Sequence, residues 1–299
     1  MRVVFNVERQ GPAPRVVRAD VRTRLDFHHS CRMPNALIIT TAGINCDREL
    51  AHAFTLAGAR VESIHLNRLL DDPARIDRFQ LIGLPGGFSY GDAIAAGRIM
   101  ATLMRQRLYP ALVRAVERGV PIIAPCNGFQ IAVQIGLLPG PAPGEPWPET
   151  APKPSIALAQ NASARFVDRW CRVELPTESR CVWTHRLEPA DEIRLLPVAH
   201  GEGRFIGESD TLIQRLADAG QIAVRFAPDD NPNGSAGDIA GICDASGLVL
   251  GLMPHPERYT RWTHHPRWTR LADSKLDEYP LGLAMFHNAV AHATQAATV

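Results

Sequence analysis

The sequence predicts an α/β protein with a mainly parallel central sheet and helices on both of its faces. Three observations predict this class. Short apolar runs recur along the chain, stretches with helical spacing of apolar residues separate them, and glycine or proline closes most runs. Continuous apolar runs are typical of strands buried on both faces, which is the situation in parallel sheets.

The first half of this alternation runs from Pro34 to about residue 135. After the first expected strand, Leu50 and Phe54 stand at helical spacing, and Gly119 with Pro121 ends the longest expected helix. Strands are expected at 36–40, 61–65, 81–84 and 122–124, and helices at 48–58, 98–119 and 127–135.

The second half is interpreted as an extension of the sheet by hairpins. Apolar segments separated by Gly, Asn, Asp and Pro turns indicate further strands at 171–175, 193–197, 221–227 and 247–253. The stretch 139–154 holds seven prolines, so we expect an extended loop outside the core.

Residues 1–33 differ from the rest of the chain. They are rich in arginine, show no sustained periodicity and lack the apolar core of a signal peptide. We expect a poorly ordered N-terminal extension, or a start assigned too early with Met33 as the true start. Residues 34–299 are then one domain.

Composition excludes several classes of function. The 32 basic and 31 acidic residues give a net charge of +1, so nothing favours a nucleic-acid or anionic-membrane partner. No apolar run approaches the roughly 18 residues of a membrane span. The six cysteines form no C-x-x-C pair, so we expect reduced, mostly buried thiols in a cytoplasmic protein and no metal site.

One cysteine stands in a different context. The strand 122–124 leads through Pro125 to Cys126, and a helix is expected to start at once. A side chain at such an apex projects above the sheet, and the helix N-terminus favours a thiolate. Cys126 is therefore a candidate nucleophile, the alternative being an ordinary buried thiol.

A thiolate nucleophile needs a base and a group that orients the base. The segment Pro254-His255-Pro256-Glu257 supplies both at the end of an expected strand. If the prolines hold it extended, residues two apart project to the same side, so Glu257 could hold one ring nitrogen of His255. The alternative is a loop with a solvated acid.

A glycine pair follows the strand 81–84, in the stretch PGGFSYGD at 85–92. Backbone N–H groups freed by Gly86 and Gly87 could stabilise an oxyanion, together with the N–H of Asn127, which follows the candidate nucleophile. A plain Gly-rich turn or a phosphate loop are the alternatives, but no G-x-x-x-x-G-K-[ST] is present.

At this point the sequence resembles the class I, triad-type glutamine amidotransferases, and among them the glutaminase components of phosphoribosylformylglycinamidine synthase. An elbow cysteine and a His-x-Glu are general features of the larger family, whereas FSYGD, HGEGRF and NPNGS are particular to this group. The resemblance runs from about residue 36 to about 260. Its segments are Gly43-x-Asn45-x-Asp47-x-Glu49, PGGFSYGD (85–92), PCNGFQI (125–131), GLLPG (136–140), NASARF (161–166), AHGEGRF (199–205), NPNGS (231–235), DIAGI (238–242) and GLMPHPER (251–258).

The resemblance implies a flavodoxin-like three-layer fold and a triad of Cys126, His255 and Glu257. It implies oxyanion donors at Gly87 and Asn127, and glutamine contacts at Gly86, Gln130, Asn161 and Ser163. Ammonia would pass to a large ATP-dependent synthase subunit, often joined by a small third subunit. ATP and Mg²⁺ would belong to that partner, and this chain would bind no cofactor.

Two stretches depart from the family pattern, at 139–154 and 261–270. His264 and His265 in the second are expected in a solvated loop, because no further metal ligands converge on them. Three other functions stay open. They are a free-standing cysteine hydrolase or deglycase, a catalytically silent regulatory subunit, and a glutaminase serving another synthase.

Overall fold

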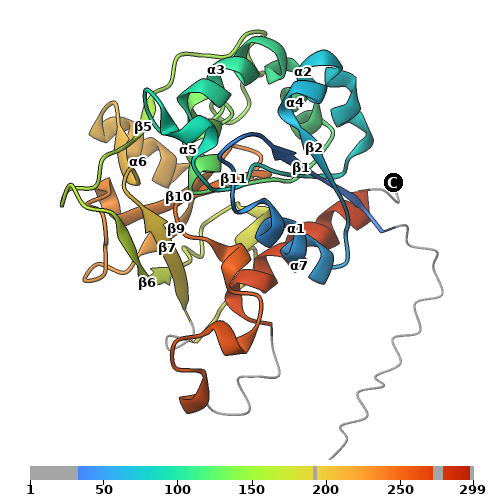
Figure 1. Cartoon of the computed structure of the whole chain (residues 1–299). Helices are drawn as coiled ribbons and strands as arrows, with labels where there is room; N and C mark the ends of the chain where they lie inside the picture. Colours follow the sequence, from blue (N-terminus) through green and yellow to red (C-terminus); the bar gives the residue numbers. More distant parts are fainter. Residues whose placement is uncertain (1–32, 191–193, 272–278, 297–299) are drawn as a thin grey trace, which may run out of the picture. The chain divides into compact units, whose positions relative to one another are not determined.

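The computed structural model describes residues 33–190, 194–271 and 279–296 (Figure 1). The expectation of a poorly ordered N-terminal extension concerns residues that lie, apart from Met33, outside these ranges. No helix among the described residues is both long and apolar enough to cross a membrane.

A nine-stranded sheet runs through the described domain in the order β2-β1-β3-β4-β11-β10-β9-β6-β7. The five strands from β2 to β11 are parallel, and the remaining four pair antiparallel. The predicted parallel sheet with a hairpin extension is confirmed. The parallel strands are β1 (Asn35–Thr40), β2 (Arg60–His65), β3 (Leu81–Gly83), β4 (Ile122–Pro125) and β11 (Val249–Leu252). The antiparallel strands are β10 (Ile239–Cys243), β9 (Ile222–Phe226), β6 (Val167–Glu174) and β7 (Leu195–His200). A separate ribbon joins β5 (Ile156–Ala159) to β8 (Arg204–Gly207).

Burial explains the composition of these strands. The four central residues of β1, Ala36–Ile39, are fully buried, because helices cover both faces of the parallel part. The edge strand β2 carries Arg60 and Glu62 and buries only Ile64. Charged side chains on an edge strand discourage pairing with another chain.

Helices form a layer on each side of the sheet, as the resemblance implied. One apolar core contains residues of α2 (Leu66–Asp71), α3 (Arg98–Arg107), α4 (Tyr109–Glu117), α5 (Asn127–Gln134) and α6 (Asp210–Asp218). The other contains residues of α1 (Asp47–Leu56) and α7 (Leu281–Ala296), which lie side by side in Figure 1. Phe54 of α1 packs edge-on against Phe286 of α7, with ring centroids 5.1 Å apart.

The single helix expected at 98–119 is in fact two. Helices α3 and α4 meet at Leu108, whose φ of −106° departs from helical geometry. Pro110 stands in the first turn of α4, where its missing N–H costs nothing, but it could not continue α3 because its ring would clash with the preceding turn. The chain therefore breaks at residue 108 and restarts.

The proline-rich stretch 139–154 contains no helix or strand, as predicted. It is held at its end by one side chain: the guanidinium of Arg105 donates to the carbonyls of Ala151 and Pro152 at 2.8 Å, and also to that of Gln134 at 2.7 Å. Trp147 packs against the core from within the stretch. The loop is thus anchored by contacts with the helical layer and not by a sheet ladder.

The expectation of a solvated loop at 261–270 is confirmed for His264 and wrong for His265. His264 is exposed, but His265 is only 2% exposed and packs near the rings of Trp170 and Tyr259, with centroids 6.3 and 6.0 Å away. The sequence showed two histidines among arginines and gave no sign of the aromatic partner on β6. His265 is therefore part of the apolar packing, and the stretch is not a simple solvated loop.

Candidate active site

Cys126 occupies the turn between β4 and α5. Its backbone has φ 51° and ψ −108°, a region that costs a non-glycine residue about 1–3 kcal/mol. The N–H of Cys126 donates to the carbonyl of Leu252 at 2.8 Å, which fixes the turn against β11. A Cβ at Gly128 would lie 2.0 Å from the carbonyl oxygen of Leu84, so only glycine lets α5 approach β3 this closely. The predicted sharp turn from strand to helix is present, and the role of Cys126 as nucleophile stays a prediction.

The segment after β11 brings His255 and Glu257 together. Nδ1 of His255 donates to Oε1 of Glu257 at 2.7 Å, and both residues are buried, at 1% and 3% exposure. The backbone is not extended as expected, because Pro256–Arg258 forms a 3₁₀ turn. The turn returns Glu257 towards the ring, so the pairing is present by a different backbone route.

His255 is held ready to carry a charge. Burial lowers the pKa of His255, but the neighbouring charges of Glu257 and Cys126 outweigh it and raise that pKa well above its usual value. Nε2 of His255 is buried and has no hydrogen-bond partner among the described residues. This nitrogen is therefore free to exchange a proton with a group in the cavity.

The elbow and the histidine open onto one cavity of about 190 Å³. Gly86 lies between them: a Cβ there would be 2.9 Å from Cε1 of His255 and 3.5 Å from Cβ of Cys126. The cavity is lined by Asn45, Cys46, Gly87, Phe88, Asp92, Ala96, Cys126, Gln130, Phe166, Ala199, His200, Gly201, Glu202, His255 and Arg258. Cys126 and His255 thus face the same small space, which can hold a substrate side chain.

The loop after β3 contains the candidate oxyanion donors. Gly87 has φ 137°, and a Cβ there would lie 2.7 Å from the N atom of Asn45, so the position requires glycine. The loop is held by the buried Asn127, whose side chain accepts from the N–H of Ser89 at 3.2 Å and donates to Oε1 of Gln130 at 2.9 Å. The N–H of Asn127 begins α5, where it has no partner within the helix.

Of the four substrate contacts that the resemblance implies, two lie at the cavity and two lie away from it. Gly86 adjoins His255, and Gln130 lines the cavity while donating from Nε2 to the carbonyl of Glu202. Asn161 is buried outside the cavity lining, and Ser163 is exposed with its hydroxyl accepting from the N–H of Arg165. All four assignments stay predictions, and the structure brings only the first two to the cavity.

Asn161 belongs to a buried polar network that sequence reasoning did not foresee. Its amide donates to the carbonyls of Arg165 and His200, both at 2.8 Å, and its oxygen accepts from Nδ1 of His200 at 3.1 Å and from the N–H of Gly203 at 3.2 Å. Asn233 donates to the carbonyl of Gly203 at 2.9 Å. The NASARF, AHGEGRF and NPNGS segments therefore meet, and they shape the cavity wall at 199–202.

Two further side chains at the cavity were missed. Cys46, at the start of α1, accepts from Nη2 of Arg258 at 3.1 Å, and Nε of Arg258 donates to Oε2 of Glu49 at 3.0 Å. These contacts join the Gly43–Glu49 segment to the His255 turn. Both segments were noted for their resemblance, but nothing local in the sequence indicates that they touch.

Comparison with known proteins supports the same interpretation. Residues 33–293 match the CobB/CobQ-like glutamine amidotransferase domain. A phosphoribosylformylglycinamidine synthase subunit PurQ from Dehalococcoides mccartyi is 42% identical over 269 residues, which cover 87% of this chain and 97% of that protein. The chain is a member of the PurQ family of glutamine amidotransferases.

Other members agree. PurQ of Treponema denticola is 37% identical over 240 residues, which cover 75% of this chain and 87% of that protein. Among solved structures, PurLQS from Thermotoga maritima contains a chain that superposes with a TM-score of 0.62 at 30% identity, covering 87% of this chain and 99% of that chain. The glutamine amidotransferase fold is therefore shared, and the roles predicted for Cys126, His255 and Glu257 stay predictions.

Proposed function

We propose that this chain is the glutaminase component of phosphoribosylformylglycinamidine synthase, which hydrolyses glutamine to glutamate and ammonia. The observation that carries the proposal is the convergence of Cys126, His255 and Glu257. The nucleophile stands at a strained elbow, the buried base faces the same cavity, and the carboxylate holds the base at 2.7 Å. Such a set is what acyl transfer requires.

In the first half of the reaction, the Cys126 thiolate attacks the side-chain amide carbon of glutamine. The carbonyl oxygen becomes an oxyanion, which the N–H groups of Gly87 and Asn127 would bind. His255 gives a proton to the departing nitrogen, and ammonia leaves a γ-glutamyl thioester on Cys126. Each donor or acid contributes about 10²–10⁴-fold.

In the second half, His255 takes a proton from water, which attacks the thioester and releases glutamate. The raised pKa of His255 suits the first proton transfer, in which the imidazolium is the acid. Glu257 stabilises that imidazolium and fixes the ring so that Nε2 points away from Glu257. The net reaction consumes glutamine and water and leaves the thiol unchanged.

The ammonia would be used by a partner. We assign it to a large ATP-dependent synthase subunit, which converts the formylglycinamide ribonucleotide amide to an amidine in purine synthesis, with a small third subunit in the assembly. The match to a chain of PurLQS supports such an assembly. ATP and Mg²⁺ belong to the synthase subunit in this proposal, because the sequence has no phosphate loop. The reaction would take place in the cytoplasm, where a reactive thiol stays reduced.

The decisive experiment measures glutamate release from glutamine by the wild type and by Cys126→Ala, each with and without the synthase subunit, ATP and the ribonucleotide. We expect release that the partner stimulates and that Cys126→Ala abolishes. Cys171→Ala is the matched control, since Cys171 is also buried but lies in the core on the α1/α7 side of the sheet. It should keep its activity.

Two other outcomes contradict the proposal in different ways. Equal release by the wild type and Cys126→Ala would remove Cys126 from the mechanism. Cys126-dependent release that no partner stimulates, at a rate typical of a free enzyme, would favour a free-standing hydrolase.

A further inference from the structure

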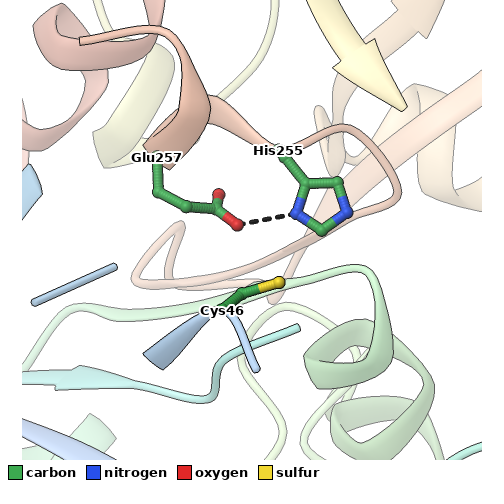
Figure 2. Close-up of side chains that lie close together, drawn as sticks. All are labelled: Cys46, His255 and Glu257. Carbon is green, nitrogen blue, oxygen red and sulfur yellow. Dashed lines mark hydrogen bonds and ion pairs between the residues drawn. The ribbon is translucent and has the colours of Figure 1, made fainter. Parts of the chain in front are cut away.

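Cys46 has no part in the mechanism above, although it lies beside two of the three catalytic groups. Figure 2 shows its sulfur below the His255 ring. It also shows Glu257 hydrogen-bonded to Nδ1 of that ring. The residue is 1% exposed, and it lines the cavity. Cysteine, histidine and glutamate are all side chains that bind zinc in proteins.

The three potential ligand atoms are close enough to share one ion. The Cys46 sulfur, a ring nitrogen of His255 and a carboxylate oxygen of Glu257 all lie within 4.8 Å of one another. Ligands of a tetrahedral zinc ion lie roughly 3.3–3.8 Å apart, given metal–ligand bonds of about 2.0–2.3 Å. Small side-chain rotations would therefore close the set around an ion.

A second observation is the unsatisfied bonding capacity of this cluster. Oε2 of Glu257 is buried and has no hydrogen-bond partner among the described residues. A buried carboxylate oxygen without a partner is unfavourable, and a cation is one group that relieves it. The cavity, which Cys46 and His255 line, supplies the route by which an ion would enter.

We propose that Cys46, His255 and Glu257 form a binding site for a borderline-soft divalent cation, Zn²⁺ in the first place, which reversibly switches the enzyme off. The ion would sit between the Cys46 thiolate, Nδ1 of His255 and Glu257, with water as a fourth ligand. Mg²⁺ would not compete, because it prefers oxygen ligands and octahedral geometry. The site is thus separate from any Mg²⁺ that the synthase reaction uses.

The switching part rests on the proposed glutaminase function. Zinc displaces the Nδ1 proton of His255, which moves to Nε2 if the ring is neutral and is released to solvent if the ring is an imidazolium. The single proton of the neutral ring is then on Nε2, and the thiol proton of Cys46 goes to solvent. Nε2 can no longer accept a proton from Cys126 or from water, and Glu257 no longer orients the ring. Binding and catalysis therefore exclude each other.

The positive charge of Arg258 disfavours a bound cation, so the effect of removing that charge on zinc affinity tests the site. Its guanidinium is 3.1 Å from the Cys46 sulfur, where it would repel a cation, but it also pairs with Glu49 at the rim. Removal of this charge should strengthen zinc binding. A merely adventitious thiol–zinc contact elsewhere in the chain would not respond to Arg258.

The test is equilibrium dialysis of the reduced full-length chain against Zn²⁺, with Mg²⁺ as the control ion. We expect one zinc per wild-type chain, affinity weakened about tenfold or more in Cys46→Ala and Cys46→Ser, and unchanged affinity in Cys171→Ala. Arg258→Gln should bind more tightly. Thermal melts without zinc establish that each variant is folded, and the serine variant keeps the size of the side chain.

Glutamate release with and without zinc is measured on the same samples in the presence of the synthase. Inhibition by zinc that weakens in parallel with affinity in the Cys46 variants supports the switch. Zinc binding that survives loss of Cys46 but disappears in Cys126→Ala would overturn the site, because the ligands would then be Cys126 and His255. If zinc binds through Cys46 but no variant or condition yields glutamine hydrolysis, the proposed function fails while the binding site stands.

Discussion

The turn that carries Cys126 borders the cavity directly and the polar network of Asn161, His200 and Asn233 borders it through His200, but the two are constructed in opposite ways. The turn is a few consecutive residues whose backbone is strained so that one side chain is left free. The network joins three distant segments whose side chains bond to one another and to the backbone. The proposed nucleophile thus lies on a locally determined element, whereas long-range contacts determine the shape of the cavity wall.

The largest effect on activity is expected at the reactive side. His255→Gln keeps an amide that can bond to Glu257 but removes the base. Glutamate release should fall by about 10²–10⁴-fold, because the proton transfers lose their donor and acceptor. Steady-state assays with the synthase present measure this. A loss of less than threefold with unchanged pH dependence would mean that another group is the base.

The elbow should also be sensitive to a change that leaves every reactive group in place. Gly128→Ala sets a Cβ against the Leu84 carbonyl at 2.0 Å, so α5 must shift from β3. We expect a loss of about 1–3 kcal/mol or more in the free energy of unfolding, with weaker activity. Urea denaturation of this variant beside Gly144→Ala tests it, because a Cβ at Gly144 meets nothing within 4 Å. A loss in Gly128→Ala no greater than that in Gly144→Ala would contradict the expected steric effect, because a Cβ at Gly144 meets no atom and only its positive φ of 85° disfavours alanine there.

The network should be visible in the pH dependence of stability. Burial, and after it the charge of nearby His255, lowers the pKa of His200 to about 4. The unfolded chain binds this proton at higher pH than the folded one, so the contribution is complete above about pH 6.5 and is lost as pH falls to about 4. At about 1.4 kcal/mol per pH unit, the difference corresponds to about 3 kcal/mol.

His200→Gln, which cannot titrate, isolates this contribution. Unfolding free energies of both proteins are measured from pH 7 to pH 4, and the wild type should lose more. Parallel curves would show that His200 is not kept neutral by the fold.

The smallest expected effects on stability distinguish Asn161 from Ser163, the two predicted substrate contacts in the NASARF segment. Asn161→Ala leaves the groups around His200 and Gly203 without partners and should cost about 1–3 kcal/mol. Ser163→Ala removes an exposed hydroxyl and should stay within about 0.5 kcal/mol. Both are compared by denaturation and by KM for glutamine. A raised KM in Ser163→Ala with normal stability would restore Ser163 as a glutamine contact.

Sequence reasoning succeeded where the signal is local. The apolar runs of β1 and β4, the elbow at Cys126 and the pairing of His255 with Glu257 follow from neighbouring residues. The extended backbone expected for that pairing was wrong, because Pro256 starts a 3₁₀ turn. Helix α6 was missed although Ser209 caps it by accepting from the N–H of Leu212 at 3.2 Å.

What could not be predicted depends on contacts between segments far apart in the chain. Cys46 and Arg258 touch across 212 positions, and nothing within either segment indicates the other. The same holds for His200, whose low pKa arises from burial by elements that meet only in the folded sheet. Family resemblance marked these segments as notable, but the contacts themselves came only from the structure.

The anchoring of the 139–154 loop by Arg105 has a consequence for how this protein can diverge. The segment is held by Trp147 near its middle and by the Arg105 contacts at Ala151 and Pro152, and it contributes no strand to the sheet. Added length in a surface loop costs little, since closure entropy grows only with the logarithm of loop length. Residues 141–146, which precede Trp147, are therefore a place where the chain can accept an inserted tag or a whole additional domain without changing the enzyme.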